Sequence, residues 1–322
     1  MEAVQRAKLP VMDAFGTKRD VILMTLTSEH ALEKMFDVFL MSLMNVTFTR
    51  KDGTKSDLAK HLVVSVMNDD SMPKCQGLAQ KYGSQFVRYG DSAFSLGNFN
   101  LFTDEFYGIG FVKIATILDG VTAGVDVLFL DADQVFFRNP LPYLLARETD
   151  VMVSGDCHHH GDETPEERFP PINNNIGFVY FRHTPMVARA VMNWGYWMTE
   201  ILRSGGKPWD QNTFAGAMEH VSTDVTRRHL SLAMLRPELF PYMCMGHCGC
   251  DLRGVPYFTV GKIPGKDGNG NCERVLMEGW YAYHMPCSGD MNDKARLMAE
   301  YSEMYQRVVG PINSRSAPFQ AL

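Results

Sequence analysis

Val125–Leu130 reads VDVLFL, an apolar run followed directly by Asp131-Ala132-Asp133. Such a run is typical of a strand buried inside a sheet. Side chains two positions apart on an extended chain project to the same side, so the two carboxylates can converge on one divalent cation. A cation held by so few protein ligands keeps open positions for phosphate oxygens, which suits an enzyme that binds a nucleotide diphosphate. The alternative is an acidic turn in which both aspartates only cap the next segment.

Strand-like and helical runs alternate around this stretch, which predicts an α/β fold with a mostly parallel central sheet and helices on both faces. Further strands are predicted over residues 20–27, 61–67, 85–89, 150–154 and 176–182. Helices are predicted over residues 29–45, 71–82, 105–119, 212–218 and 293–309, with another that begins at Thr184-Pro185. Residues 155–175 and 261–271 predict loops, and the first is long enough to act as a lid or binding segment.

The chain has 322 residues, enough for one large α/β domain or two small ones. We expect an N-terminal extension over residues 1–19, a single domain over 20–310 and a C-terminal tail over 311–322. The formal net charge is -6 and no stripe of Lys and Arg stands out, which argues against a nucleic-acid partner. No stretch of about 18 apolar residues predicts a membrane span.

Seven cysteines are present, and five of them fall between residues 244 and 287. This clustering favours disulfides that tie down a loop-rich region in an oxidising compartment. The alternative is a zinc site around Cys244, Cys248 and Cys250. The N-terminus lacks the apolar core of a secretory signal. We therefore expect either the Golgi lumen, with an anchor upstream of this chain, or the cytoplasm if the chain is complete.

Four further pieces follow the aspartate pair: Asn173-Asn174-Asn175-Ile176-Gly177-Phe178, Trp209-Asp210-Gln211, Phe240-Pro241, and His284 with Gly289 and Lys294. In this order the chain resembles the nucleotide-diphospho-sugar transferases of glycosyltransferase family 77, over roughly residues 20–300. The resemblance implies a GT-A fold, in which a Rossmann-like nucleotide-binding half joins an acceptor-binding half.

The resemblance also implies a metal site. Asp131 and Asp133 correspond to the family's Asp-x-Asp, which holds a divalent cation on the sugar-nucleotide diphosphate, and His284 corresponds to a late histidine ligand. Oxygen ligands with one nitrogen suit Mn²⁺, with Mg²⁺ as the alternative. The cation would neutralise the charge that develops on the departing diphosphate. The alternative for His284 is a buried histidine that packs beside aromatic residues.

Donor-binding roles are implied for several residues besides Asp131. Brändén's rule places ligands at the carboxyl ends of parallel strands, which supports a uridine and ribose site at the end of the first strand. Lys113 is expected near the diphosphate or donor sugar, unless it is a solvated helix lysine. The expected donor-binding residues are Thr25, Thr27, Lys113, Asp131, Asn175, Gly177, Gly289 and Lys294.

Asp210 and Gln211 match the family's Asp-Gln pair, which lies against the reacting sugar on the side away from the cation. Such side chains can stabilise an oxocarbenium-like centre or orient sugar hydroxyls, so we expect the catalytic residues here. The competing interpretation of Asp210 is a helix N-cap. Both interpretations can hold together.

We therefore expect a metal-dependent glycosyltransferase that moves a pentose or hexose from a UDP-sugar to a hydroxyl of a glycan, such as a cell-wall polysaccharide, or of a glycoprotein, with retention of configuration. Two other classes are kept open. One is a phosphatase of the haloacid dehalogenase type, in which the first aspartate is the nucleophile, although Gln134 and Val135 lack the expected glycine-threonine sequel. The other is a non-catalytic protein that binds nucleotide sugars.

Overall fold

The computed structural model describes residues 2–90, 103–155, 157, 174–222, 230–244, 246–251, 271–319 and 321–322. The strands are β1 (Leu9–Met12), β2 (Lys18–Thr27), β3 (Thr47–Thr49), β4 (Lys55–Asp57), β5 (Leu62–Val66), β6 (Gln85–Arg88), β7 (Asp126–Leu130), β8 (Gln134–Phe136), β9 (Val151–Gly155), β10 (Asn174–Phe181), β11 (Leu232–Met234) and β12 (Ala282–His284).

The helices are α1 (Glu2–Ala7), α2 (Glu29–Lys34), α3 (Phe36–Asn45), the 3₁₀ turn η1 (Leu58–His61), α4 (Met72–Tyr82), α5 (Asp104–Thr122), α6 (Leu141–Leu145), α7 (Pro185–Arg203), α8 (Asp210–Ser222), α9 (Arg274–Met277) and α10 (Met291–Val308). The predicted strands and helices are all found, with shifted ends. The loop predicted over 155–175 lies largely outside the described residues, as does nearly all of that over 261–271.

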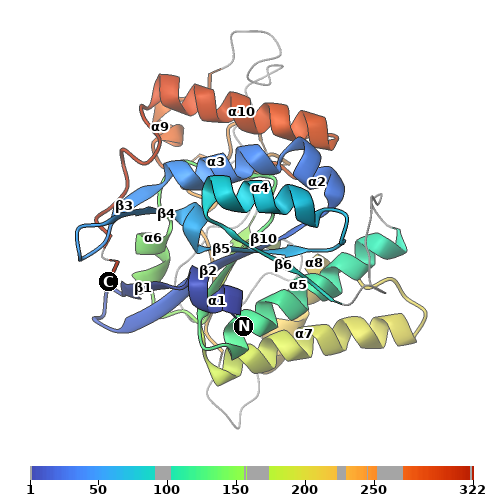
Figure 1. Ribbon diagram of the computed structural model, residues 1–322. Coiled ribbons are helices and arrows are strands. Elements are labelled where there is room, and N and C mark those ends of the chain that lie inside the picture. The colour runs from blue at the N-terminus through green and yellow to red at the C-terminus, as the bar shows by residue number, and fades with distance from the viewer. Residues whose placement is uncertain are drawn as a thin grey trace.

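An eight-stranded sheet forms the centre of the described structure, in the order β11-β9-β10-β7-β2-β5-β6, with β1 paired to β2 (Figure 1). β7, β2, β5 and β6 run parallel to one another, whereas β10 is antiparallel to both β7 and β9. The carboxyl ends of β2, β5, β6 and β7 therefore meet at one edge. This mostly parallel sheet with helices on both faces confirms the predicted α/β fold class.

Each central strand is buried on both faces because successive side chains enter two different cores. Leu128 and Leu130 of β7 pack in one core, whereas Val127 and Phe129 pack in the other. β2 divides in the same way, with Leu23 on the first side and Ile22 on the second. Continuous apolar runs such as VDVLFL are the expected signature of strands covered on both sides.

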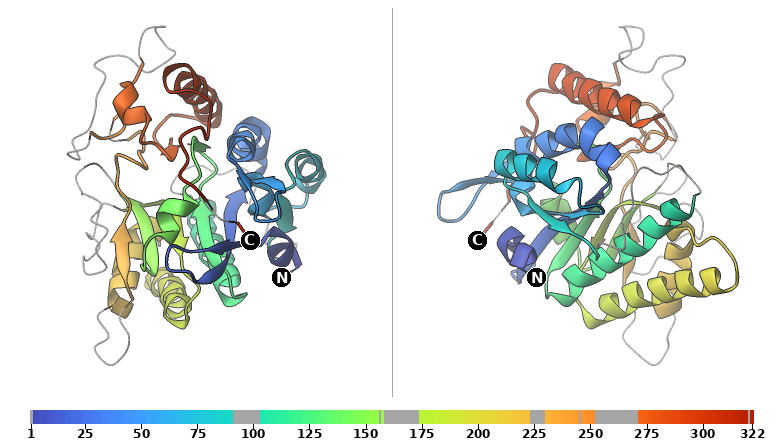
Figure 2. Two further views of the ribbon diagram at one scale, coloured as in Figure 1. Left: turned by 90° about the vertical axis from the view of Figure 1, so that its left-hand side faces the viewer. Right: turned by 45° about the vertical axis from the view of Figure 1, so that its right-hand side comes forward.

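Two layers of helices cover these faces (Figures 1 and 2). Helices α3 and α10 contribute to the first core, through Phe39 and Tyr301 among others, and α10 packs across α2 and α3. Helices α5, α7 and α8 pack against one another and form the second layer, with Trp194 of α7 buried there. Elements from both layers therefore reach the edge at which β7 ends.

Two elements differ from the predicted boundaries. The single helix expected over 29–45 is split into α2 and α3, because Met35 departs from helical angles with φ -127° and ψ -17°. β10 begins two residues earlier than predicted, since Asn174 and Asn175 pair with Gly155 and Ser154 of β9. The register of this pair then shifts before Val179. Such irregularities in a ladder change the direction of side chains, often beside functional sites.

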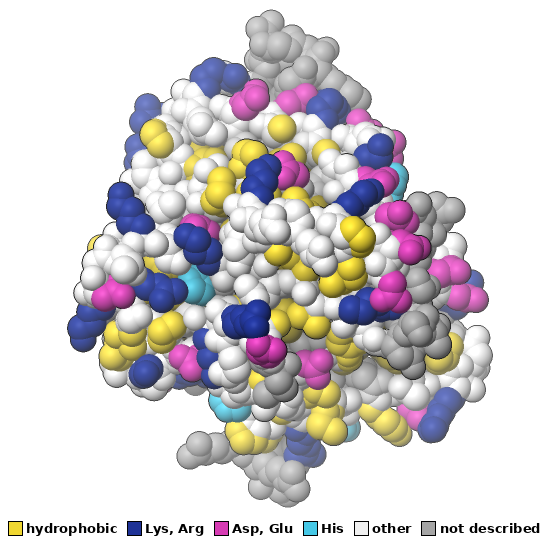
Figure 3. Space-filling view, in the orientation of Figure 1, with side chains coloured by type: hydrophobic (Ala, Val, Ile, Leu, Met, Phe, Trp, Pro, Cys, Tyr) yellow, Lys and Arg dark blue, Asp and Glu magenta, His cyan; other side chains and the backbone are white. Residues whose placement is uncertain are grey.

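The two ends of the chain lie close to β1 (Figure 1). The Leu322 N–H donates to the Pro10 carbonyl at 2.8 Å, and Ala321, fully buried, forms bridges with Val11 and Arg50. On the face shown in Figure 3, basic and acidic side chains are interspersed. In the part of the chain that the structure describes, no helix is both long and apolar enough to cross a bilayer.

Candidate active site

The aspartate pair lies directly after β7, at the edge where the parallel strands end. The side chain of Asp131 is 34% exposed, whereas that of Asp133 is only 10% exposed. The backbone N–H of Asp131 donates to the Gly177 carbonyl of β10 at 2.7 Å, which ties the pair to the neighbouring strand. Asp131 is therefore the more accessible of the two carboxylates, and Asp133 is the more deeply buried.

His284 reaches this edge through a short ladder between β12 and β8. His284 pairs with Gln134, and the Met285 N–H donates to the Asp133 carbonyl at 2.9 Å. The imidazole Nε2 then lies 2.9 Å from Oδ1 of Asp133. The other ring nitrogen, Nδ1, is buried and has no hydrogen-bond partner among the described residues.

Asp131, Asp133 and His284 can each offer one ligand atom, and these atoms lie within 4.8 Å of one another. Two carboxylate oxygens with one imidazole nitrogen form a donor set that suits Mn²⁺ and, less well, Mg²⁺. The unpartnered Nδ1 of His284 shows that this ring's hydrogen-bonding capacity is not used up by the protein. The three residues fit a divalent cation. The alternative of an acidic turn does not account for the histidine.

Lys113 of α5 joins Asp131 to Asp210. Its Nζ lies 3.1 Å from Oδ1 of Asp131 and 3.3 Å from Oδ2 of Asp210. Burial by itself lowers the pKa of Lys113, but the two carboxylates outweigh burial and hold that pKa above its usual value. The ammonium stays charged, and the interpretation of Lys113 as a solvated helix lysine is wrong.

Lys294 of α10 approaches from the other helical layer. Its Nζ donates to Oδ2 of Asp133 at 2.5 Å. Burial by itself raises the pKa of Asp133, but Lys294 and His284 outweigh burial and hold the pKa well below its usual range. Asp133 is therefore ionised at neutral pH.

Asp210 is both a helix start and a member of this charged group. It opens α8, and its Oδ1 accepts the Gln211 N–H at 2.9 Å while Oδ2 faces Lys113. Trp194 donates its indole N–H to the Asp210 carbonyl at 3.1 Å. Gln211 follows half-buried, and within the described residues only its backbone N–H bonds to Asp210. Asp210 thus lies both at the start of the helix and in the charged group, and its catalytic role stays a prediction.

The backbone of Gly177 packs directly against the imidazole ring of His284. A Cβ built on Gly177 would lie 2.2 Å from Cε1 of His284, so only a glycine leaves room for the ring. Asn175 shapes the same strand, because its Oδ1 accepts the Gly177 N–H at 2.9 Å. These contacts place both residues beside the candidate cation site.

Three other predicted donor residues are not in contact with the charged group. Thr25 and Thr27 are buried at the end of β2, and their hydroxyls donate to the Leu26 and Ser28 carbonyls. Gly289 has φ +100°, a conformation that glycine adopts readily, and precedes α10. It shapes the turn into the helix that carries Lys294.

Two residues that were not among the predicted site residues support the site. Gln134 is buried directly after Asp133 and donates its amide N–H to the Gly177 carbonyl. Gly110 lies inside α5, where a Cβ would come within 2.9 Å of the Asp210 Cβ. The sequence offered one signal for each of them: Gln134 is a polar residue at the start of a strand, and Gly110 is a glycine inside a helix.

Disulfides hold the segment that carries His284. They join Cys157 to Cys250, Cys244 to Cys287 and Cys248 to Cys272. The predicted disulfides are confirmed and the zinc alternative is wrong, because each proposed ligand thiol is consumed in a disulfide. Cys287 follows His284 by three residues, so its bond to Cys244 fixes the chain just beyond His284.

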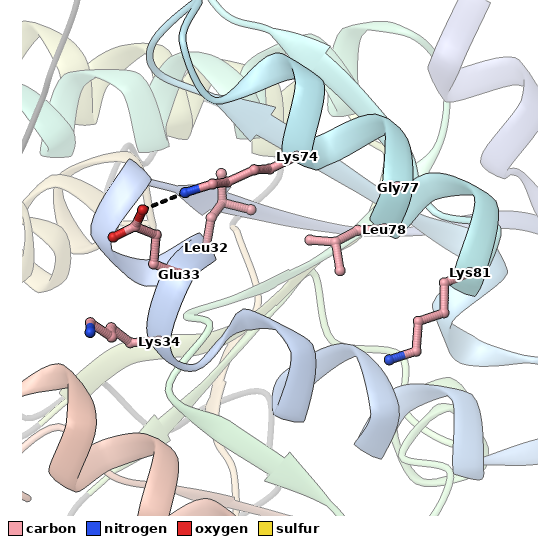
Figure 4. A pocket seen from close by; sticks show the side chains of 7 residues that line it. All are labelled: Leu32, Glu33, Lys34, Lys74, Gly77, Leu78 and Lys81. Atoms are coloured by element: carbon pink, nitrogen blue, oxygen red, sulfur yellow. Dashed lines mark hydrogen bonds and ion pairs between the residues drawn. The ribbon is translucent and has the colours of Figure 1, made fainter.

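A hollow lies between α2 and α4, with a volume of about 610 Å³ (Figure 4). Leu32 and Leu78 line it together with charged side chains, and Lys74 at its rim is paired with Glu33. None of the predicted site residues contributes to this hollow. It is separate from the acidic group at the end of β7.

Residues 57–298, which include Lys113, the aspartate pair, Asp210 and His284, match the family model described as nucleotide-diphospho-sugar transferase. The match covers well over half of the chain. The chain belongs to the nucleotide-diphospho-sugar transferase family. The resemblance is thereby confirmed at this level, whereas assignment of the transferase to family 77 stays a prediction. Neither alternative class receives support.

Three named proteins are similar to this chain. Arabinosyltransferase XEG113 of Arabidopsis thaliana is 32% identical to the transferase over 114 residues, which are 34% of this chain and only 17% of that protein. Mouse xyloside xylosyltransferase 1 aligns over 83% of this chain and 97% of its own, with 14% identity and a TM-score of 0.43. The bifunctional glycosyltransferase WbbM aligns over 89% of this chain and 51% of its own, with 12% identity and a TM-score of 0.46.

Proposed function

We propose that this transferase moves a sugar from a UDP-sugar to a hydroxyl of a glycan or glycoprotein, with Mn²⁺ or Mg²⁺ bound by Asp131, Asp133 and His284. The observation that supports this most strongly is the convergence of these three side chains at the carboxyl end of β7. Ligands of open α/β sheets bind outside this end of the strands. When bound, the cation supplies neutralisation of charge on the diphosphate.

The side chains around the cation ligands would divide the remaining work. Lys294 would contact the diphosphate, and Lys113 would hold Asp131 and Asp210 at their present separation. Asp210 and Gln211 would face the donor sugar, where a carboxylate stabilises positive charge that develops at the anomeric carbon. Thr25, Thr27, Asn175, Gly177 and Gly289 would shape the donor site from behind.

Retention of configuration is part of the proposal. The acceptor hydroxyl oxygen would bond to the anomeric carbon on the face from which the diphosphate leaves. The bond between that carbon and the phosphate oxygen would break, and the departing phosphate oxygen would take the acceptor's proton. The products are a glycosidic bond and UDP. No protein nucleophile is required in this route.

A pentose is the favoured donor sugar, because the relative named above is an arabinosyltransferase. The three disulfides are consistent with an oxidising compartment, and we propose the Golgi lumen. A glycan acceptor, such as a cell-wall polysaccharide, would then be reached there.

Release of UDP from UDP-arabinose, UDP-xylose, UDP-galactose and UDP-glucose, with Mn²⁺ and with EDTA, tests the function. We expect turnover with at least one pentose donor, abolished by EDTA and by Asp133→Ala. Asp52→Ala, at an exposed turn, is the matched control and should keep full activity. Full activity of Asp133→Ala would show that the site is assigned wrongly. Tight UDP binding without turnover on any donor and acceptor would favour a binding protein.

A further inference from the structure

Both carboxylate oxygens of Asp133 already have partners. Oδ1 faces Nε2 of His284 at 2.9 Å, and Oδ2 accepts from the Lys294 ammonium at 2.5 Å. The side chains of Asp133 and Lys294 are only 10% and 15% exposed, so solvent screens this ion pair weakly. A cation that coordinates Oδ2 of Asp133 must come close to the Lys294 ammonium, and the repulsion between these like charges opposes metal binding while the ion pair is intact.

The balance of charges in the site also opposes binding of a cation alone. Three carboxylates, those of Asp131, Asp133 and Asp210, are faced by the two ammonium groups of Lys113 and Lys294. The lysines thus cancel most of the negative charge that would attract a divalent cation. A nucleoside diphosphate brings further negative charge into the site and offers the ammonium groups a second set of oxygens.

The two lysines differ in how freely they can change partners. Lys113 is held between two carboxylates on a buried helix face. Lys294 has Asp133 as its one recorded ion-pair partner among the described residues. Its backbone is fixed in the first turn of α10, where its N–H donates to the Asp290 carbonyl at 2.9 Å. The flexible four-carbon stem lets the ammonium swing while the helix stays in place.

We infer that Lys294 couples the two ligands of this site: it competes with the divalent cation for Asp133 and moves to the diphosphate when the nucleotide binds. This inference rests on the proposed function. The cation alone then binds weakly, and the nucleoside diphosphate raises its affinity. By linkage, the cation raises the affinity for the nucleotide by the same factor.

Mn²⁺ binding, followed by the electron paramagnetic resonance of free Mn²⁺ with and without UDP, tests the inference. Lys294→Met keeps the length of the stem and removes the charge. We expect it to bind Mn²⁺ alone about tenfold more tightly than the unaltered protein, and to lose most of the increase in Mn²⁺ affinity that UDP produces. Lys294→Gln should show the same direction of change.

Arg296→Met is the matched control. It removes one positive charge from the same helix, where Arg296 pairs with Glu300 and Asp293 and does not contact Asp133. We expect its Mn²⁺ affinity to equal that of the unaltered protein within about twofold, because exposed charges are strongly screened. Thermal unfolding of each variant checks that it is folded.

The outcomes separate this inference from the proposed function. If the unaltered protein binds Mn²⁺ with UDP, but Lys294→Met and Lys294→Gln bind Mn²⁺ alone no better than Arg296→Met does, the inference is overturned and the metal site stands. If no variant binds Mn²⁺ even with UDP, both fail. Equal gains in Lys294→Met and Arg296→Met would show a general charge effect and would also overturn it.

Discussion

Gly177 and His284 constrain each other's shape. The imidazole occupies the space in which any Cβ on residue 177 would lie, at 2.2 Å from Cε1. The carbonyl of the same glycine accepts N–H groups from Asp131 and from Gln134. One residue without a side chain therefore constrains the positions of Asp131 and His284, two of the proposed cation ligands.

Gly177→Ala should displace His284 without unfolding the protein. Overpacking of this kind costs about 1–3 kcal/mol of stability. Misplacement of a ligand by about 1 Å can lower turnover about a hundredfold. UDP release and Mn²⁺ affinity in the presence of UDP measure the effect. Gly77→Ala is the control, since a Cβ there meets nothing within 4 Å. Unchanged turnover in Gly177→Ala would contradict the placement of His284.

Lys113→Met should destabilise the fold as well as the site. The change leaves Asp131 and Asp210 without their shared cation, and breaking a buried ion pair costs about 3–5 kcal/mol. Urea unfolding gives the loss of free energy of unfolding. Lys81→Met, which breaks an exposed pair with Asp37, should change little. Equal losses in the two variants would mean that burial does not strengthen the Lys113 pairs.

The 3₁₀ turn η1 carries a histidine that links it to α1. His61 Nδ1 donates to the Ala7 carbonyl at 2.8 Å, which leaves Nε2 to accept from Ser56 and Arg50. Burial, helped by the positive charge of Arg50, lowers the pKa of His61 from 6.5 to about 4. The neutral ring is thus the form that holds these elements together.

Stability should fall in acid because of this histidine. Between pH 6.5 and about 4 the unfolded chain takes up a proton on His61 that the folded chain does not. The contribution of His61 to the free energy of unfolding is fully present above pH 6.5. It is lost as the pH falls towards 4, by about 3 kcal/mol in total. Urea unfolding at pH 7.5 and pH 4.5 measures the slope. His61→Gln should flatten it, and an identical slope would contradict the assignment.

At the scale of the whole molecule, the last residues of the chain pack against β1 near its beginning. Residues after α10 pack against the two small sheets: the Asn313 N–H donates to the Phe137 carbonyl just after β8 at 2.6 Å, and Phe319 packs on Phe48 of β3. Ala321 and Leu322 then bond to the first β-hairpin and to its neighbourhood. The predicted division into an extension, a domain and a tail stays a prediction, and these contacts allow it to be tested.

Deletion of residues 311–322 should lower stability by about 3 kcal/mol or more, because each lost hydrogen bond contributes about 1 kcal/mol and apolar contacts are lost besides. The melting temperature and the urea midpoint measure the change. Asn313→Ala alone should show a smaller part of it. A truncated chain with an unchanged melting temperature would support a domain boundary at residue 310.

Local patterns were sufficient for the long helices and for six strands of the central sheet, whereas the short strands β1, β3, β4, β8, β11 and β12 were not predicted. Apolar runs with turn residues between them located the central strands, and the Thr184-Pro185 start located α7. The helical pattern is continuous across Met35, so it did not predict the break between α2 and α3 at this residue. The aspartate pair was recognisable because both carboxylates come from three consecutive residues at a strand end.

The partners of those carboxylates depended on the assembled fold. His284 and Lys294 lie 151 and 161 residues beyond Asp133. Lys113 contacts Asp131 from α5, which belongs to the other helical layer than the α10 helix that carries Lys294. Three other features also join residues that are far apart in the sequence. They are the pairing of the cysteines, the packing of His284 against Gly177, and the ion pair between Lys294 and Asp133. Short-range periodicity specifies which face of a strand or helix is buried. Which distant side chains meet depends on strand register and helix packing, and these depend on the whole core at once.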